Sequence, residues 1–198
     1  MTRRPLHHDA KDAEMTPEEM FDEAFDSAFK DRRNLISFLE GIDPSHVHWR
    51  PPDGEWSLHE NLEHILLTDN YYARFIEKRL AEAAESGSWD TAPENPETMS
   101  REALRRREQG RVPAPDFLIP KGEGDFREMI AKLLPNREAV HQMMLPYRGT
   151  DMSRYTHEHF RYGDLNIYDR IVYSGTHDFL HQDQMTRVLQ APGYPGSG

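Results

Sequence analysis

Four helix-start signals restrict the fold of this 198-residue chain more than any other feature of its sequence. In each signal, a Thr, Ser, Asp or Asn stands three positions before an acidic residue, and apolar residues then recur every three or four positions. The signals are Thr16–Glu19, Ser57–Glu60, Asp125–Glu128 and Asn166–Asp169. The first side chain accepts a hydrogen bond from a backbone N–H of the first turn, and the acidic residue accepts one in return. The pattern therefore predicts an all-α four-helix bundle.

Apolar positions and breaker residues indicate how far each helix runs. The first helix is expected to end before Gly41, the second near Ser86, and the last near Gln190. Gly175 interrupts the last helix at a cost of roughly 1 kcal/mol relative to alanine, which predicts that a neighbouring helix approaches closely there. The apolar positions at helical spacing in the first three helices are Phe21, Phe25, Ala28, Leu35 and Leu39; Leu58, Leu62, Ile65, Tyr72 and Ile76; and Met129, Ile130, Leu133, Val140 and Met144.

The segment from residue 87 to residue 124 lacks this helical pattern. It is rich in proline and contains a charged block from Arg101 to Glu108. A long irregular connection inside a compact domain is uncommon and usually functional. We interpret the segment as a crossover with room for one short helix. The predicted organisation is a mobile tail over residues 1–14, one helical domain over 15–191 with 87–124 as an irregular insertion, and a C-terminal tail over 192–198.

Charge and composition exclude several classes of protein. The chain has 24 basic and 35 acidic residues, and a net charge of −11 does not favour binding to a phosphate backbone, so no nucleic-acid partner is expected. The absence of cysteine excludes disulfides and thiolate metal sites. The first ten residues lack the apolar core of a signal peptide, and no apolar run is long enough to cross a bilayer. We therefore expect a cytoplasmic protein without a membrane partner.

His177 and His181 stand four positions apart in the last predicted helix. This spacing turns the helix by only about 40° and places the two Cβ atoms about 5–6 Å apart, so both imidazoles can reach one metal. Spacing alone favours a surface pair, because a chain with 11 histidines forms such pairs by chance. Tyr173, Leu180 and Val188 lie on the same broad face, which predicts that the pair points inward. A metal would then satisfy two buried imidazoles at once.

The other histidines, taken singly, indicate ordinary structural roles. His64 lies on the flank of the second helix, where a lone histidine is more often a satisfied core residue than a ligand. His59 is expected in an exposed first turn. His157 and His159 are expected at the surface, in a short polar connection. None of these four positions identifies a metal site by itself.

Two stretches of the chain resemble the DinB/YfiT-like superfamily of metalloenzymes. The run from Trp56 to His64 (WSLHENLEH) resembles that family's tryptophan–serine helix start followed by a histidine. Residues 163–166 (GDLN) and the run from His177 to Gln184 (HDFLHQDQ) are similar to its last helix. There, a histidine pair at i and i+4 is commonly followed by a glutamine at i+7. The resemblance covers about residues 17–86 and 125–190.

The resemblance implies an up-down-down-up bundle in which His64, His177 and His181 bind one divalent metal ion. It suggests nickel, zinc or iron without choosing between them, and it implies a homodimer. Many members of the family have a further histidine directly before the second of the pair, where this chain has Leu180. The crossover over residues 87–124 is also longer than usual, so the resemblance does not identify a substrate.

Two classes of function follow from a three-histidine site. One is a metal-dependent enzyme whose open coordination position serves thiol transfer or hydrolysis of an unknown small-molecule substrate. The alternative is a non-catalytic metal-binding or stress-associated dimeric helical protein. Glu60, one turn before His64, has the helical spacing of a general base, but the simpler interpretation is that it only completes the helix cap. No catalytic residue is predicted.

Overall fold

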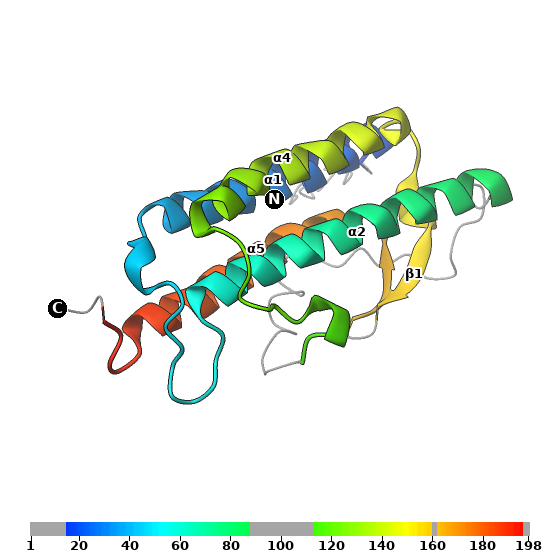
Figure 1. Cartoon of the computed structure of the whole chain (residues 1–198). Helices are drawn as coiled ribbons and strands as arrows, with labels where there is room; N and C mark the ends of the chain where they lie inside the picture. Colours follow the sequence, from blue (N-terminus) through cyan, green and yellow to red (C-terminus); the bar gives the residue numbers. More distant parts are fainter. Residues whose placement is uncertain (1–14, 88–112, 160–161, 196–198) are drawn as a thin grey trace, which may run out of the picture.

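The computed structural model describes residues 15–87, 113–159 and 162–195 (Figure 1). Each long helix begins directly after its predicted cap, and the cap side chain accepts a backbone hydrogen bond from the third residue that follows it. The prediction of an all-α bundle is confirmed. The long helices of this part of the chain are α1 (Pro17–Glu40), α2 (Leu58–Ser86), α4 (Phe126–Met144) and α5 (Ile167–Gln190); short 3₁₀ turns lie at Pro44–His46, Asp116–Leu118, Leu145–Tyr147 and Met152–Arg154.

The order of the helices requires a long crossover. α1 and α5 run in one direction, and α2 and α4 run in the other, which is the up-down-down-up arrangement (Figure 1). α1 packs against α4 and α5, and α2 packs against the same two helices. Because α2 and α4 are parallel, the chain between them must return over the length of α2, which is about 43 Å. The charged block from Arg101 to Glu108 lies outside the described residues.

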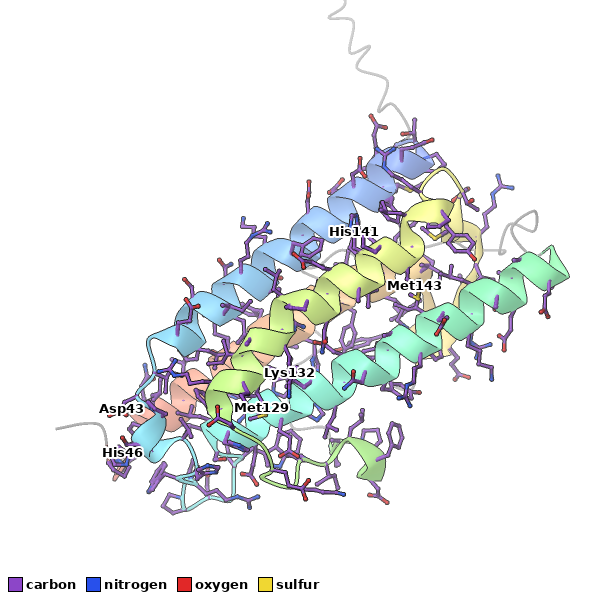
Figure 2. The ribbon with its side chains drawn as sticks, turned by 45° about the horizontal axis from the view of Figure 1, so that its top comes forward. Asp43, His46, Met129, Lys132, His141 and Met143 are labelled. Atoms are coloured by element: carbon purple, nitrogen blue, oxygen red, sulfur yellow. The ribbon has the colours of Figure 1, made fainter. Side chains whose placement is uncertain are left out.

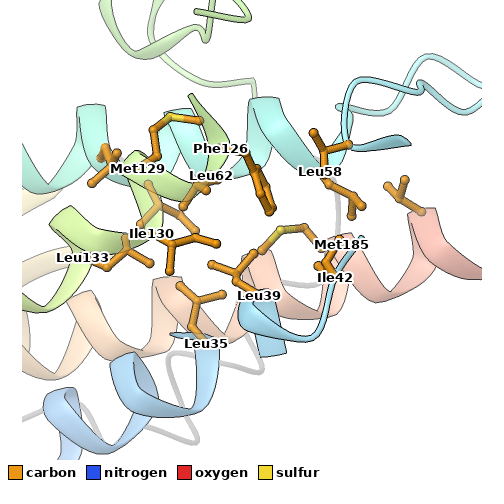
Figure 3. Packing of buried hydrophobic residues seen from close by; sticks show 14 of the residues in the cluster. Leu35, Leu39, Ile42, Leu58, Leu62, Phe126, Met129, Ile130, Leu133 and Met185 are labelled. Atoms are coloured by element: carbon orange, nitrogen blue, oxygen red, sulfur yellow. The ribbon is translucent and has the colours of Figure 1, made fainter. Parts of the chain in front are cut away.

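The bundle has apolar clusters at both of its ends. One cluster joins the C-terminal part of α1 to the start of α2 and α4 and includes Leu39, Leu62 and Ile130 (Figure 3). At the opposite end, Phe25 packs its ring against His141 of α4 at 4.6 Å between centroids, and Figure 2 shows His141 on the side of α4 that faces α1. No helix in the described residues is long and apolar enough to cross a membrane.

A small β-sheet precedes α5, where the sequence pattern predicted only a polar connection. β1 (Thr156–His159) pairs antiparallel with β2 (Gly163–Asn166). The surface position expected for His157 and His159 is wrong, because both side chains are buried while Glu158 between them is exposed. Alternate burial is the period of a strand, and four residues are too few to distinguish it from a loop.

Gly175 lies at the closest approach of α1 and α5, as its place inside a helix predicted. A Cβ atom at this position would stand 2.9 Å from the Cα of Ala28 and 3.2 Å from a carboxylate oxygen of Asp31. Backbone atoms cannot rotate away from such a contact, so a larger residue must push the two helices apart.

Replacing Gly175 by alanine is expected to lower the free energy of unfolding by about 1 kcal/mol or more, because overpacking outweighs the gain in helix propensity. Urea denaturation followed by circular dichroism measures the change. Gly41→Ala is the matched control, since a Cβ atom there would meet only a carbonyl oxygen at 3.5 Å. Equal stability of the Gly175→Ala variant and the wild type would contradict the close approach.

Candidate metal centre

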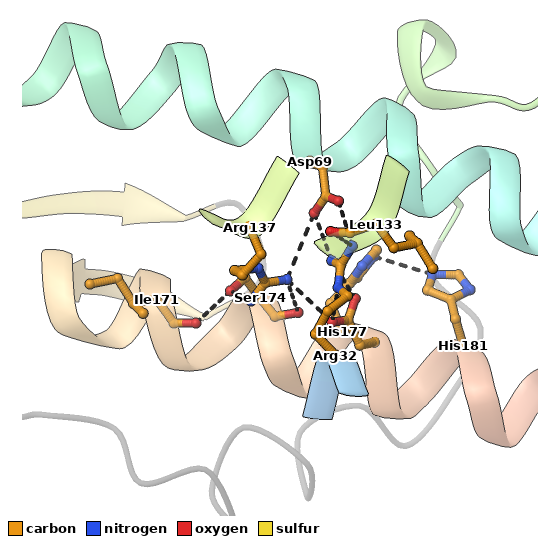
Figure 4. Close-up of polar contacts among 9 residues, drawn as sticks. Arg32, Asp69, Leu133, Arg137, Ile171, Ser174, His177 and His181 are labelled. Carbon is orange, nitrogen blue, oxygen red and sulfur yellow. Dashed lines mark hydrogen bonds and ion pairs between the residues drawn. The ribbon is translucent and has the colours of Figure 1, made fainter. Parts of the chain in front are cut away.

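His64 of α2 meets His177 and His181 of α5 in the middle of the bundle. One ring nitrogen from each residue lies within 4.8 Å of the other two, so the three could hold one metal ion. The Nε2 atoms of His177 and His181 are 3.2 Å apart (Figure 4). Two ligands at 2.0–2.1 Å from one tetrahedral metal are about 3.4 Å apart, so this pair fits a shared ion with little adjustment.

The remaining ring nitrogen of His64 fixes which nitrogen faces the centre. Nδ1 of His64 donates a hydrogen bond of 2.8 Å to the carbonyl oxygen of Leu118. Nε2 therefore carries a lone pair, and the Thr68 hydroxyl lies 3.4 Å from it. That distance is long for a hydrogen bond to a hydroxyl. His64 thus directs the lone pair of Nε2 to the centre.

His181 is oriented in the same way by a residue of α2. Its Nδ1 donates a hydrogen bond of 2.8 Å to Oδ1 of Asn61. The amide group of Asn61 is itself fixed, because its Nδ2 donates to the carbonyl oxygens of Trp56 and Ser57 at 3.2 and 2.9 Å. A histidine that ligates a metal generally donates its other nitrogen to such an acceptor, which sets the tautomer and the ring orientation.

Burial keeps the three imidazoles uncharged at neutral pH. Desolvation lowers the pKa of His64, although its bond to Leu118 opposes the shift. The pKa values of His177 and His181 are lowered much further, first by burial and then by the charge of neighbouring imidazoles. Gln184, one turn after His181, hydrogen-bonds His181 and opposes part of this shift. A neutral imidazole is the form that ligates a metal.

A buried ion network, with one charged residue from each long helix, adjoins the three histidines (Figure 4). Arg32 of α1 makes bidentate contacts with Asp178 of α5, at 2.7 and 2.8 Å, and with Asp69 of α2, at 2.7 and 2.9 Å. Arg137 of α4 donates to Asp178 at 3.2 Å and to the hydroxyl of Ser174. Burial alone would lower the pKa of Arg32, but the two carboxylates raise it above its ordinary value.

Sequence reasoning missed this network, although the chain carries a signal for it. Arg32 stands four positions after Ala28 and three before Leu35, so it occupies the apolar stripe of its own helix. Asp69, Arg137 and Asp178 likewise replace apolar residues on their stripes. A charge at such a position predicts a buried partner, but the pattern does not say which one.

The three histidines line a cavity of about 890 Å³. Aromatic and polar side chains both line it, and the aromatic ones include Trp56, Tyr71, Tyr173 and Phe117. Five residues of the insertion also line it, so this part of the insertion lies against the site: Pro113, Ala114, Pro115, Phe117 and Leu118. The volume is that of a pocket for a small molecule.

A carboxylate of α2 holds the insertion in place. The backbone N–H groups of Lys121, Gly122 and Glu123 all donate to Glu63, at distances from 2.6 to 3.2 Å. His64, the next residue, bonds the carbonyl oxygen of Leu118 in the same segment. These adjacent anchors position the segment over the cavity.

Two other residues considered from the sequence have structural roles. Glu60 completes the cap by accepting from the backbone N–H of Ser57, and it also pairs with Arg50, so it is not placed as a general base. The exposed position expected for His59 is wrong. His59 is fully buried, because its Nε2 bonds the carbonyl oxygen of Gly124 at 2.9 Å and its ring packs against His48. The segment before α4 covers it, which no local pattern of α2 reveals.

Comparison with known families agrees with the fold. The family model described as DinB superfamily matches residues 30–185, a range that includes all three histidines. The chain therefore belongs to the DinB superfamily, and the resemblance seen in the sequence is confirmed. No curated protein and no solved structure gave a match.

His157 is expected to make the fold sensitive to acid. Burial, followed by the positive charges of Arg170 and Arg79, lowers the pKa of His157 from 6.5 to about 3. The unfolded chain takes up a proton below pH 6.5 while the folded chain does not, so stability falls as the pH decreases from 6.5 towards 3. By pH 5 this residue alone should cost up to about 2 kcal/mol.

Urea denaturation at pH 7.5 and pH 5.0 measures this loss of stability. In the His157→Gln variant the loss should be smaller than in the wild type by up to about 2 kcal/mol. His48→Gln, at an exposed loop position, should behave like the wild type. The same pH dependence in all three proteins would mean that His157 does not titrate as described.

Proposed function

We propose that this protein is a metal-dependent enzyme that acts on a small molecule in the cavity. In this proposal, His64, His177 and His181 bind one divalent ion of nickel, zinc or iron. One observation carries the proposal: three neutral imidazoles converge on one point in the wall of a cavity of about 890 Å³. Structural metal sites usually have four protein ligands and are closed, whereas catalytic sites keep a position open.

The residues around the centre suit such a role. Leu118 and Asn61 fix two of the ligand rings by hydrogen bonds at 2.8 Å, so the donor atoms are in place before a metal arrives. The aromatic side chains of Trp56, Tyr71 and Phe117 line the cavity and offer apolar surface to a substrate. A metal in this position would lower the pKa of a bound water or thiol, which supplies a nucleophile at neutral pH. Thiol transfer and hydrolysis are the reaction classes that we propose.

The protein should take up about one divalent ion per chain. His64→Ala, His177→Ala and His181→Ala should each reduce this stoichiometry strongly, because two imidazoles remain of three. His48→Ala, which removes an exposed histidine, should leave it unchanged. Elemental analysis after reloading of chelated protein with nickel, zinc or ferrous iron measures the effect.

A stoichiometry near zero with all three metals would refute the metal centre. If metal binds, cobalt-loaded protein shows whether the metal keeps an open coordination position, which a catalytic site needs and a purely structural site lacks. Added 2-mercaptoethanol should produce a thiolate-to-cobalt absorption band if a coordination position is open towards the cavity. An unchanged spectrum would favour the alternative, a metal-binding protein without turnover.

Asn61 of α2 provides a test of how one helix orients a metal-binding side chain, His181, of another helix, α5. Asn61→Leu removes the acceptor for Nδ1 of His181 and should weaken metal affinity about 10- to 100-fold. Asn61→Asp keeps an acceptor oxygen and should retain most of the affinity. Competition with a chromophoric chelator gives both values. Equal losses in the two variants would mean that Asn61 acts by packing and not by its hydrogen bond to His181.

A further inference from the structure

Arg170 is a buried cation in the wall of the same cavity. Its side chain lines the cavity, and the residue is only 6% exposed. It stands seven positions before His177 on α5, so both lie on one face of the helix, about 10 Å apart along its axis. A substrate that reaches the histidines at one end can therefore reach Arg170 at the other.

The described residues give Arg170 no carboxylate partner. Its Nε donates to Nε2 of His157, its guanidinium also hydrogen-bonds the Tyr72 hydroxyl, and it lies over the rings of Tyr72 and Phe75, at 5.3 and 5.0 Å from their centroids. Each of these groups is uncharged. Three carboxylates line the cavity, but Asp183 pairs with Arg187, and no ion pair joins Glu55, Glu158 or Asp183 to Arg170 in the described part of the chain.

The position of Arg170 on its helix increases the cost of its charge. It lies in the first turns of α5, where the helix dipole favours negative charges and disfavours positive ones. Burial also disfavours the charged form and lowers the pKa of Arg170. Arg32 contrasts with it, because Arg32 is equally buried but has two carboxylate partners. Buried charges are normally paired, so a guanidinium with no carboxylate partner among the described residues can pair with an anionic ligand.

We propose that Arg170 binds an anionic group of the substrate, so that the substrate is a small acid with an apolar body between its anionic end and its reacting end. The guanidinium would donate to a carboxylate or phosphate, and Tyr72 and Phe75 would contact the apolar body. The inference deepens the proposed function by naming a substrate class and rests on it for the reacting end. Arg170 is assigned to binding and not to catalysis.

Isothermal titration with three probes tests the proposal: phenylacetate, phenyl phosphate and the neutral phenylacetamide. The wild-type protein should bind at least one of the two anions roughly tenfold or more tightly than the amide, and the tighter anion identifies the head group. Arg170→Gln should reduce this preference to less than threefold. Arg187→Gln is the matched control, because Arg187 lines the same cavity but is exposed and already paired with Asp183. It should keep the preference.

Both metal-free and metal-loaded protein are titrated, so that the result does not depend on the metal centre. The dependence on Arg170 is expected in both forms. An anion preference confined to metal-loaded protein would show that the metal binds the anion and would overturn the proposal. Equal affinity for acid and amide, or a preference that survives Arg170→Gln, would also overturn it.

A measurement on the wild type covers the case in which Arg170→Gln does not fold. In ¹⁵N-labelled protein, phenylacetate or phenyl phosphate should shift the Nε–H resonance of Arg170, which Arg170→Lys identifies by its disappearance. The resonance of Arg187 should not move. An unmoved Arg170 resonance at saturating probe would refute direct binding.

Discussion

Arg32 is a fully buried guanidinium, and the rest of the bundle is arranged around the need to compensate its charge. An uncompensated charge in the interior is very costly, and removal of one partner from a buried pair typically costs about 3–5 kcal/mol. Arg32 therefore needs Asp69 and Asp178 within hydrogen-bond distance. These residues belong to α2 and α5, so one side chain of α1 fixes the relative position of three helices.

The same network sets the geometry of the candidate metal centre. Asp178 directly follows His177 and stands one turn before His181, so its bond to Arg32 fixes the rotation of α5. Asp69 does the same for α2, five residues after His64. Because both helices are held against Arg32, three imidazoles from two helices point to one place. The apolar clusters at the two ends of the bundle stabilise the fold, while this polar layer between them decides the register.

The insertion contributes to the site through contacts that α2 provides. Glu63 binds three consecutive backbone N–H groups, and His64 bonds Leu118 a few residues earlier in the same segment. The segment thus closes one side of the cavity and fixes a ligand ring at the same time. Arg170 lies in the wall of the same cavity, which aromatic residues also line.

The sequence by itself determined the helices and the spacing of His177 and His181, because caps and apolar periodicity act over a few residues. It placed His64 in the site only through family resemblance. Only the tertiary structure decided that Asn61 orients His181 across 120 positions, that Arg32 meets Asp178 across 146, and that His157 is buried. Such contacts depend on how whole helices rotate and slide against one another, and no local pattern specifies that. A charge on an apolar stripe, such as Arg32, reveals that a partner exists, while the partner's identity is set by packing.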